Sequence, residues 1–115
     1  MGVKNMSSRK ILQDTIDRFH KKVECDPKIR QEMIGIKKCV NIDLGCESYH
    51  FILKEAHIDQ LCDGMAECPD IIITSDPQTV EDLYTGKMKV MKAYALRKIR
   101  VKGSMEDVMR LRSLF

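Results

Sequence analysis

The chain has 115 residues, of which 43% are apolar and 32% are charged, an ordinary composition for a globular protein. This length predicts one domain over residues 1–115. No apolar run approaches the roughly 20 residues that cross a bilayer, and the first residues lack the apolar core of a secretory signal. Residues 1–86 hold eleven basic and fifteen acidic side chains, whereas residues 87–115 hold nine basic and two acidic ones. This asymmetry favours an anionic partner surface; a solvated basic face is the alternative.

Two helices are predicted at the start of the chain. Ser7 or Ser8 can cap the first, whose apolar side chains follow helical spacing from Ile11 to Val23. An Asp-Pro pair then ends this helix and starts a second, short one, which Gly35 closes.

An alternating pattern follows and predicts strands. Val40, Ile42 and Leu44 alternate with polar residues, as in a half-buried strand. Residues 45–48 are expected to connect it by a hairpin to a second strand, over residues 49–54. The segment 56–65 alternates weakly and is predicted to be a third strand.

The final third opens with an apolar, β-branched run at residues 70–74, which predicts a buried fourth strand. Asp76 and the proline after it begin a helix that stops at Gly86. A further helical stretch, a fifth strand at residues 99–101 and a last helix capped by Ser104 complete the chain. We therefore predict an α+β fold in which helices gather on one face of the sheet and a late strand returns to it.

The order of residues in this final third resembles the sterol carrier protein-two family of lipid-binding domains. The matching positions are Asp70, Leu83, Gly86-Lys87-Met88, Ala93, residues 98–103 and residues 109–111. The resemblance implies a five-stranded, mostly antiparallel sheet with helices packed on one face, which enclose an apolar tunnel for a lipid. The chain departs from the family at Arg97, where a glycine usually precedes the last strand.

The resemblance also implies that the last two helices face the lipid. Four of the eight methionines lie there, and methionine is flexible enough to line a wall that accepts variable apolar shapes. Ordinary core packing is the alternative. We expect the cavity to be lined by Leu83, Met88, Met91, Tyr94, Met105, Val108, Met109 and Phe115. Tyr84 and Tyr94 are the expected contacts for a headgroup or hydroxyl.

The last predicted strand carries three basic residues, Lys98, Arg100 and Lys102, which alternate with Ile99 and Val101. Because side chains alternate between the faces of a strand, the three basic groups share one face. We expect them to contact an anionic membrane, where each contributes about 1 kcal/mol near the surface. A solvated outer face of the sheet is the alternative.

Five cysteines and histidines in the middle of the chain are candidate metal ligands: Cys46, His50, His57, Cys62 and Cys68. Sulfur and imidazole are suitable zinc ligands, but the spacings match no finger or ribbon and no Cys-x-x-Cys pair occurs. We therefore expect neither a metal nor a catalytic Cys–His pair. The odd number of cysteines and the missing signal segment predict reduced thiols and a cytoplasmic location.

The sequence also lacks a P-loop, a dinucleotide-binding glycine cluster, a nucleophile elbow and a zinc-protease motif, so we expect no enzyme and no cofactor. From the resemblance we expect a lipid-binding or lipid-transfer protein that sequesters a fatty acyl chain, a fatty acyl-CoA or a sterol-like lipid. The alternatives are a nucleic-acid-associated interaction domain that uses the basic C-terminal part, or a Cys/His zinc-binding protein. Nucleic acid is not the expected partner, because no RNP-like aromatic strand is present.

Overall fold

The helices begin where the sequence supplies a capping side chain. The computed structural model describes residues 7–111. In it Ser7, Asp26, Asp76 and Ser104 each accept a hydrogen bond from a backbone N–H of the following turn, at 2.8 to 3.2 Å. The helices are α1 (Ser8–Cys25), α2 (Pro27–Met33), α3 (Pro77–Thr85), α4 (Val90–Ala95) and α5 (Met105–Leu111). The predicted caps are confirmed, whereas α4 begins without a side-chain cap.

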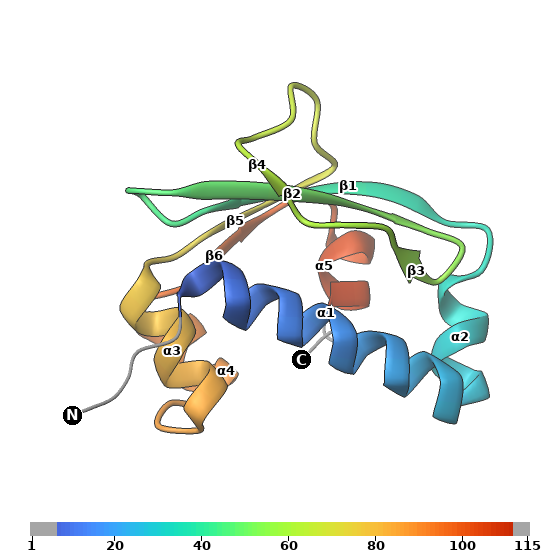
Figure 1. Cartoon of the computed structure of the whole chain (residues 1–115), viewed down its shortest axis with the longest axis horizontal. Coiled ribbons are helices and arrows are strands. Elements are labelled where there is room, and N and C mark those ends of the chain that lie inside the picture. The colour runs from blue at the N-terminus through green and yellow to red at the C-terminus, as the bar shows by residue number, and fades with distance from the viewer. Residues whose placement is uncertain (1–6, 112–115) are drawn as a thin grey trace.

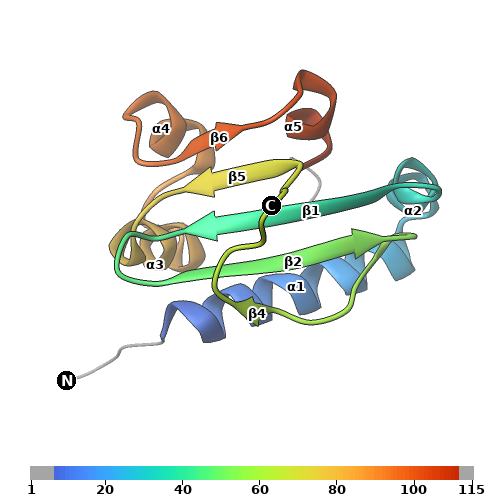
Figure 2. The same cartoon turned by 90° about the horizontal axis from the view of Figure 1, so that it is seen from above.

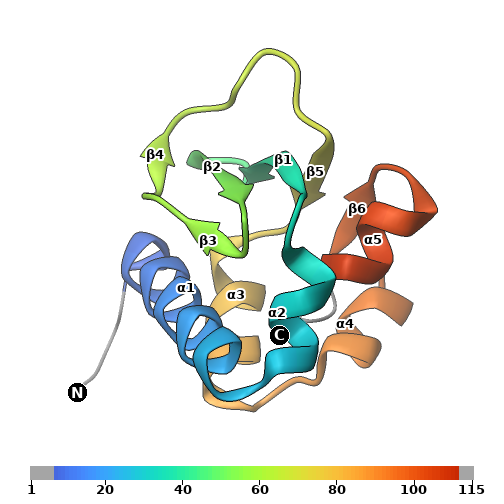
Figure 3. The same ribbon diagram turned by 90° about the vertical axis from the view of Figure 1, so that its right-hand side faces the viewer.

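The strands form one mixed sheet, and the helices cover one of its faces (Figures 1 and 3). They are β1 (Lys37–Asp43), β2 (Ser48–Lys54), β3 (His57–Ile58), β4 (Cys62–Asp63), β5 (Ile71–Thr74) and β6 (Arg100–Lys102). The spatial order is β3-β2-β1-β5-β6, with β4 also paired to β2. Figure 2 shows β2, β1, β5 and β6 side by side. The predicted α+β fold, with a late strand that returns to the sheet, is confirmed.

The sheet has six strands in place of the predicted five because the third predicted strand is interrupted. Its register against β2 changes from Leu53 opposite Ile58 to His50 opposite Cys62, so it holds one residue more than the stretch that it faces. Such a bulge resets the alternation of side chains. As a result Leu61 turns into the core and is only 2% exposed.

The connection between β4 and β5 crosses the face of the sheet opposite the helices (Figure 1). Asn41, in the middle of β1, holds this connection: its side chain accepts a hydrogen bond from Ala66 N at 2.9 Å and donates one to Ala66 O at 3.0 Å. Asn41 is therefore buried, although the alternation assigns it to the half-solvated face. The crossing brings β5 beside β1 as the one parallel pair of the described sheet.

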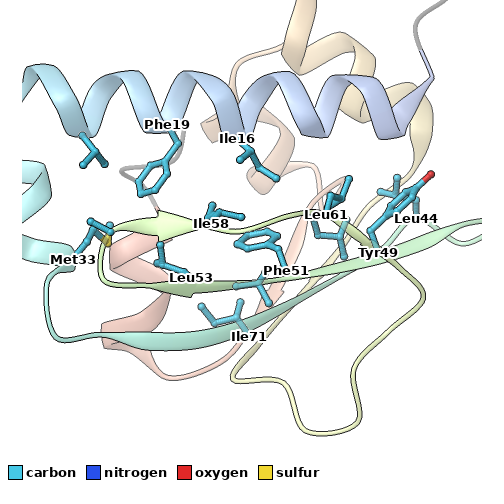
Figure 4. Close-up of a cluster of buried hydrophobic side chains, with 14 residues drawn as sticks. Ile16, Phe19, Met33, Leu44, Tyr49, Phe51, Leu53, Ile58, Leu61 and Ile71 are labelled. Carbon is cyan, nitrogen blue, oxygen red and sulfur yellow. The ribbon is translucent and has the colours of Figure 1, made fainter.

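The hydrophobic core lies between α1 and the sheet (Figure 4). Its buried members are Ile16, Phe19, Val23, Met33, Val40, Ile42, Leu44, Tyr49, Phe51, Leu53, Ala56, Ile58, Leu61 and Ile71. Later in the described chain, partly buried apolar residues pack against this core: Ile73, Val80 and Val101. The core is therefore nearly complete before the final third begins. Within residues 7–111, no helix is both long and apolar enough to cross a membrane.

The turn before β6 has a backbone conformation that glycine favours, although the residue there is Arg97. Its φ is +60°, in the left-handed region that costs a residue with a Cβ about 1–2 kcal/mol. Lys98 N donates to Ala93 O at 2.8 Å and Arg97 N donates to Tyr94 O at 3.1 Å. These two bonds are those of a Schellman motif, which closes α4. The departure from the family's usual glycine thus keeps the turn and concentrates strain on Arg97.

Replacing Arg97 by glycine should raise the free energy of unfolding by up to about 1 kcal/mol, because relief of the left-handed strain outweighs the added freedom of the unfolded chain. Urea unfolding measures the change. Lys98→Gly is the matched control: its backbone is not left-handed, so this variant should lose roughly 0.5–1 kcal/mol. An equal loss in both variants would contradict the assignment of strain to Arg97.

Candidate functional site

The final third of the chain runs as short elements along one edge of the sheet. α3 ends at Gly86, whose φ is +84°, and Met88 N then donates to Asp82 O at 3.1 Å as the chain turns toward α4. Beyond β6, a Cβ added to Gly103 would lie 3.0 Å from Asp70 O. Glycine therefore lets the chain pass close to the start of β5 before it enters α5.

A buried carboxylate anchors α5 to the sheet. Asp107 has a side chain that is only 6% exposed, and its Oδ1 lies 3.2 Å from Lys38 Nζ on β1 and 3.1 Å from an Arg110 guanidinium nitrogen. The predicted cap at Ser104 is confirmed, since Asp107 N donates to Ser104 Oγ at 3.1 Å. The carboxylate itself joins α5 to the sheet. Local sequence gives no signal for this contact, because Lys38 lies far away along the chain.

The predicted cavity-lining residues divide into two groups. Leu83, Met88 and Val108 are half-buried. The others described are largely exposed: Met91 by 73%, Tyr94 by 52%, Met105 by 78% and Met109 by 53%. Phe115 lies outside the described residues.

The two exposed methionines of α5 share one side of that helix. Met105 and Met109 are four residues apart, so they lie one above the other, and each is about 160° around the helix from Asp107. Because Asp107 holds α5 to β1, the methionine side faces away from β1. α5 therefore presents an apolar surface that the core leaves free.

Of the two tyrosines expected to meet a headgroup, Tyr84 is already engaged. Its hydroxyl donates to Asp14 Oδ2 on α1 at 2.7 Å, and the Arg18 guanidinium lies 4.7 Å from the centre of its ring. The hydrogen bond to Asp14, together with partial burial, raises the pKa of Tyr84. Tyr84 thus fastens α3 to α1, and Tyr94 is the more accessible hydroxyl of the two.

The basic residues of the last strand lie on the outer face of the sheet. Val101 pairs with Ile73, and both pack against the core. Arg100 and Lys102 alternate with Val101 and are exposed, so they point to the face opposite the helices. Lys98 precedes β6 and is also exposed; its carbonyl accepts a hydrogen bond from the Ser75 hydroxyl at 2.8 Å.

The Cys/His group does not assemble in space. Within the described residues, no three His, Cys, Asp or Glu side chains are arranged to hold a metal ion, and all five cysteines are free thiols. His50 Nδ1 lies 2.9 Å from Gly64 O.

His57 instead stacks on His20 of α1, with ring centroids 4.5 Å apart and planes at 8°. His20 Nε2 accepts a hydrogen bond from Ile58 N at 3.1 Å, which joins α1 to β3. Burial lowers the pKa of His20, and the neighbouring His57 lowers it further. The hydrogen bond also requires an unprotonated Nε2, so this contact exists in the neutral form of His20.

Residues 16–115 match the family model described as the SCP-2 sterol transfer family. No match was found among curated proteins. Sterol Carrier Protein 2 Like 2 from Aedes aegypti is 21% identical, with a TM-score of 0.61, over 93% of this chain and 98% of that one. The sterol carrier protein domain 2 of Helicoverpa armigera is 18% identical, with a TM-score of 0.61, over 98% of this chain and 91% of that one.

An enzyme also contains a similar fold. The stereoselective inverting sec-alkylsulfatase Pisa1 from Pseudomonas sp. is 11% identical, with a TM-score of 0.58, over 75% of this chain. The chain spans only 14% of that enzyme's length. At these identities the likeness concerns the fold.

The free energy of unfolding should fall as the pH falls below about 6.5, the ordinary pKa of histidine. The folded state holds His20 with a lowered pKa, so the unfolded chain binds more protons in this range, and acid favours unfolding. His20→Gln, whose amide oxygen can accept the Ile58 N–H but does not titrate, should show a flatter dependence. Urea unfolding between roughly pH 5 and 7.5 compares the two. Identical pH profiles would contradict this role.

The different burial of Met33 and Met91 predicts that truncating them costs different amounts of stability. Met33 is 1% exposed and belongs to the core, so Met33→Ala should cost about 2–5 kcal/mol of unfolding free energy. Met91 is 73% exposed, so Met91→Ala should cost less than about 0.5 kcal/mol. Equal losses, measured by urea unfolding, would mean that Met91 is packed as core.

Proposed function

The chain belongs to the SCP-2 sterol transfer family and is a lipid-binding domain of that family; we propose that it sequesters the apolar part of one lipid against its C-terminal helices. The cargo would be a fatty acyl chain, a fatty acyl-CoA or a sterol-like lipid. The protein acts by binding alone, shields the cargo from water and releases it unchanged.

The observation that carries this proposal is the division between a finished core and unused apolar side chains. The core under α1 is nearly complete by Ile71. Beyond it, Met91, Tyr94, Met105 and Met109 leave more than half of their surface exposed. Large apolar groups gathered in one part of a soluble protein mark a binding surface more often than a chance arrangement.

The cargo contacts follow from the burial of these side chains. Leu83, Met88 and Val108 are half-buried and form the inner wall. The four exposed residues form the part of the site that closes on the lipid. Methionine suits this role because its unbranched side chain adapts to different shapes. Each methylene removed from water contributes about 0.8 kcal/mol, so binding needs few polar contacts and selectivity is low.

A related structure supports the ligand class. One similar solved structure is described as palmitated SCP2L2 from Aedes aegypti. The match covers 92% of this chain with a TM-score of 0.61. We infer a similar acyl ligand here. The free cysteines fit a reducing compartment such as the cytoplasm.

Delivery of the lipid requires contact with a membrane, and we propose an anionic one. Lys98, Arg100 and Lys102 are exposed and add to the positive charge of the final third, which attracts acidic headgroups. This attraction weakens in salt, since the Debye length shrinks from about 10 Å at 0.1 M to about 3 Å at 1 M.

Met109→Trp should block uptake of a fluorescent fatty acid, because the larger ring fills the space that the cargo would occupy. Loss of contact with two methylenes alone weakens binding by about tenfold. Met65→Trp is the matched control: Met65 is 52% exposed and Met109 53% exposed. Met65 lies in the connection on the opposite face of the sheet, so its variant should keep full uptake.

The titration is made in solution without vesicles, and unfolding free energies are measured on the same samples. Unchanged uptake in Met109→Trp would remove Met109 from the site. Equal loss in both variants, at equal stability, would place the cargo elsewhere.

A further inference from the structure

Residues 87–98 combine positive charge with exposed apolar side chains more densely than any other described stretch. This segment carries five basic residues and no acidic one. Its one buried side chain is that of Ala93, with Met88 half-buried and the remainder exposed. A stretch that contributes so little to the core leaves its apolar side chains available for contacts outside the protein.

The geometry of α4 separates a protein-facing side from a projecting side. Ala93 is fully buried and is the point at which α4 packs against the protein. Met91 lies two residues before it, about 160° around the helix, and is 73% exposed. Tyr94 lies about 60° from Met91 around the helix and is 52% exposed. α4 therefore presents an apolar crest of Met91 and Tyr94, and Leu96, which is 53% exposed, follows the last residue of the helix.

Basic residues surround this crest, and α4 itself lies at the edge of the helical layer, away from the sheet (Figures 1 and 3). They are Lys87, Lys89, Lys92, Arg97 and Lys98, all of them exposed. Long basic side chains can lay their apolar stems along acyl chains while the charge stays at the headgroups. The apolar residues thus match the acyl region of an anionic bilayer, and the basic residues around them match its headgroups.

Nucleic acid fits this surface less well. Its non-specific recognition combines a basic groove with aromatic rings on which bases stack. The segment has one aromatic residue, Tyr94, whereas Met91, Leu96 and Val90 are aliphatic. Aliphatic side chains gain more from hydrocarbon than from a phosphate backbone.

From these observations we propose that residues 87–98 are a membrane-docking element that inserts Met91 and Tyr94 between the lipids of an anionic bilayer. This rests on the proposed function only in that a lipid carrier must reach a membrane. It adds the element that makes contact and makes insertion, together with charge, the source of affinity. Arg100 and Lys102 point to the outer face of the sheet and act at longer range.

A tryptophan reporter tests insertion directly, because the chain contains no tryptophan. Tyr94→Trp and Met65→Trp start from equal exposures, 52% each, on different parts of the molecule. With vesicles of phosphatidylcholine and phosphatidylserine, Tyr94→Trp emission should shift to the blue and be quenched by brominated lipid. Met65→Trp emission should not change. A shift in both, or in neither, would overturn the proposal.

Charge and insertion are then separated by two sets of variants. Lys87→Gln, Lys89→Gln and Lys92→Gln together should weaken partition into these vesicles by about a hundredfold. Lys10→Gln, Lys21→Gln and Lys28→Gln, on α1 and α2, remove the same charge and should weaken it far less. Tyr94→Ser should weaken the binding that persists in 1 M salt by about tenfold, whereas Ile34→Ser should not; Tyr94 is 52% exposed and Ile34 49%.

Two further readouts keep the outcomes distinct. Fatty acid uptake without vesicles should be unchanged in the Lys87, Lys89 and Lys92 variant. If vesicle binding fails while uptake persists, the docking element is wrong and the carrier function stands; the reverse result leaves the docking element and removes the carrier. Tighter binding of single-stranded RNA than of the anionic vesicles at the same salt would assign the surface to nucleic acid.

Discussion

Burial of the apolar side of α1 against β1 and β2 is the interaction on which the rest of the molecule depends. Phe19 is fully buried there, in one cluster with Val40 and Phe51 of the sheet. Two polar contacts fix the same helix to its neighbours: the Tyr84 hydroxyl donates to Asp14, and His20 accepts a hydrogen bond from the backbone of β3. Because α1 already buries the apolar face of the sheet, the C-terminal elements can carry apolar side chains that the core does not need for stability.

Features that depend on neighbours in sequence were predictable. The caps at Ser7 and Asp76 need only a short polar side chain before a helix, and the β1–β2 hairpin follows from the alternation of apolar residues. Features that depend on distant partners were not. The bulge that buries Leu61 is set by the register against β2, and the ion pair of Asp107 joins positions far apart in the chain.

The burial of the candidate site residues could not be predicted from the sequence either. Met33 and Met91 are the same residue at helical positions, yet one is 1% exposed and the other 73%. Periodicity identifies a helix face but not what lies opposite it, so the sequence alone leaves core and binding surface as equal interpretations. Arg97 illustrates the complementary case: it stands where the family usually has glycine, and the hydrogen bonds that close α4 keep the left-handed turn nevertheless.

The short last strand has a consequence for how copies of this protein meet. β6 is an edge of the sheet and spans Arg100–Lys102, and a free edge is a template on which another chain can add a strand. Two such edges placed side by side would bring Arg100 and Lys102 of one copy against the same residues of the other. Like charges directly opposite one another oppose pairing. The composition of this strand therefore protects an exposed backbone against self-association, in a protein that already presents apolar surface nearby.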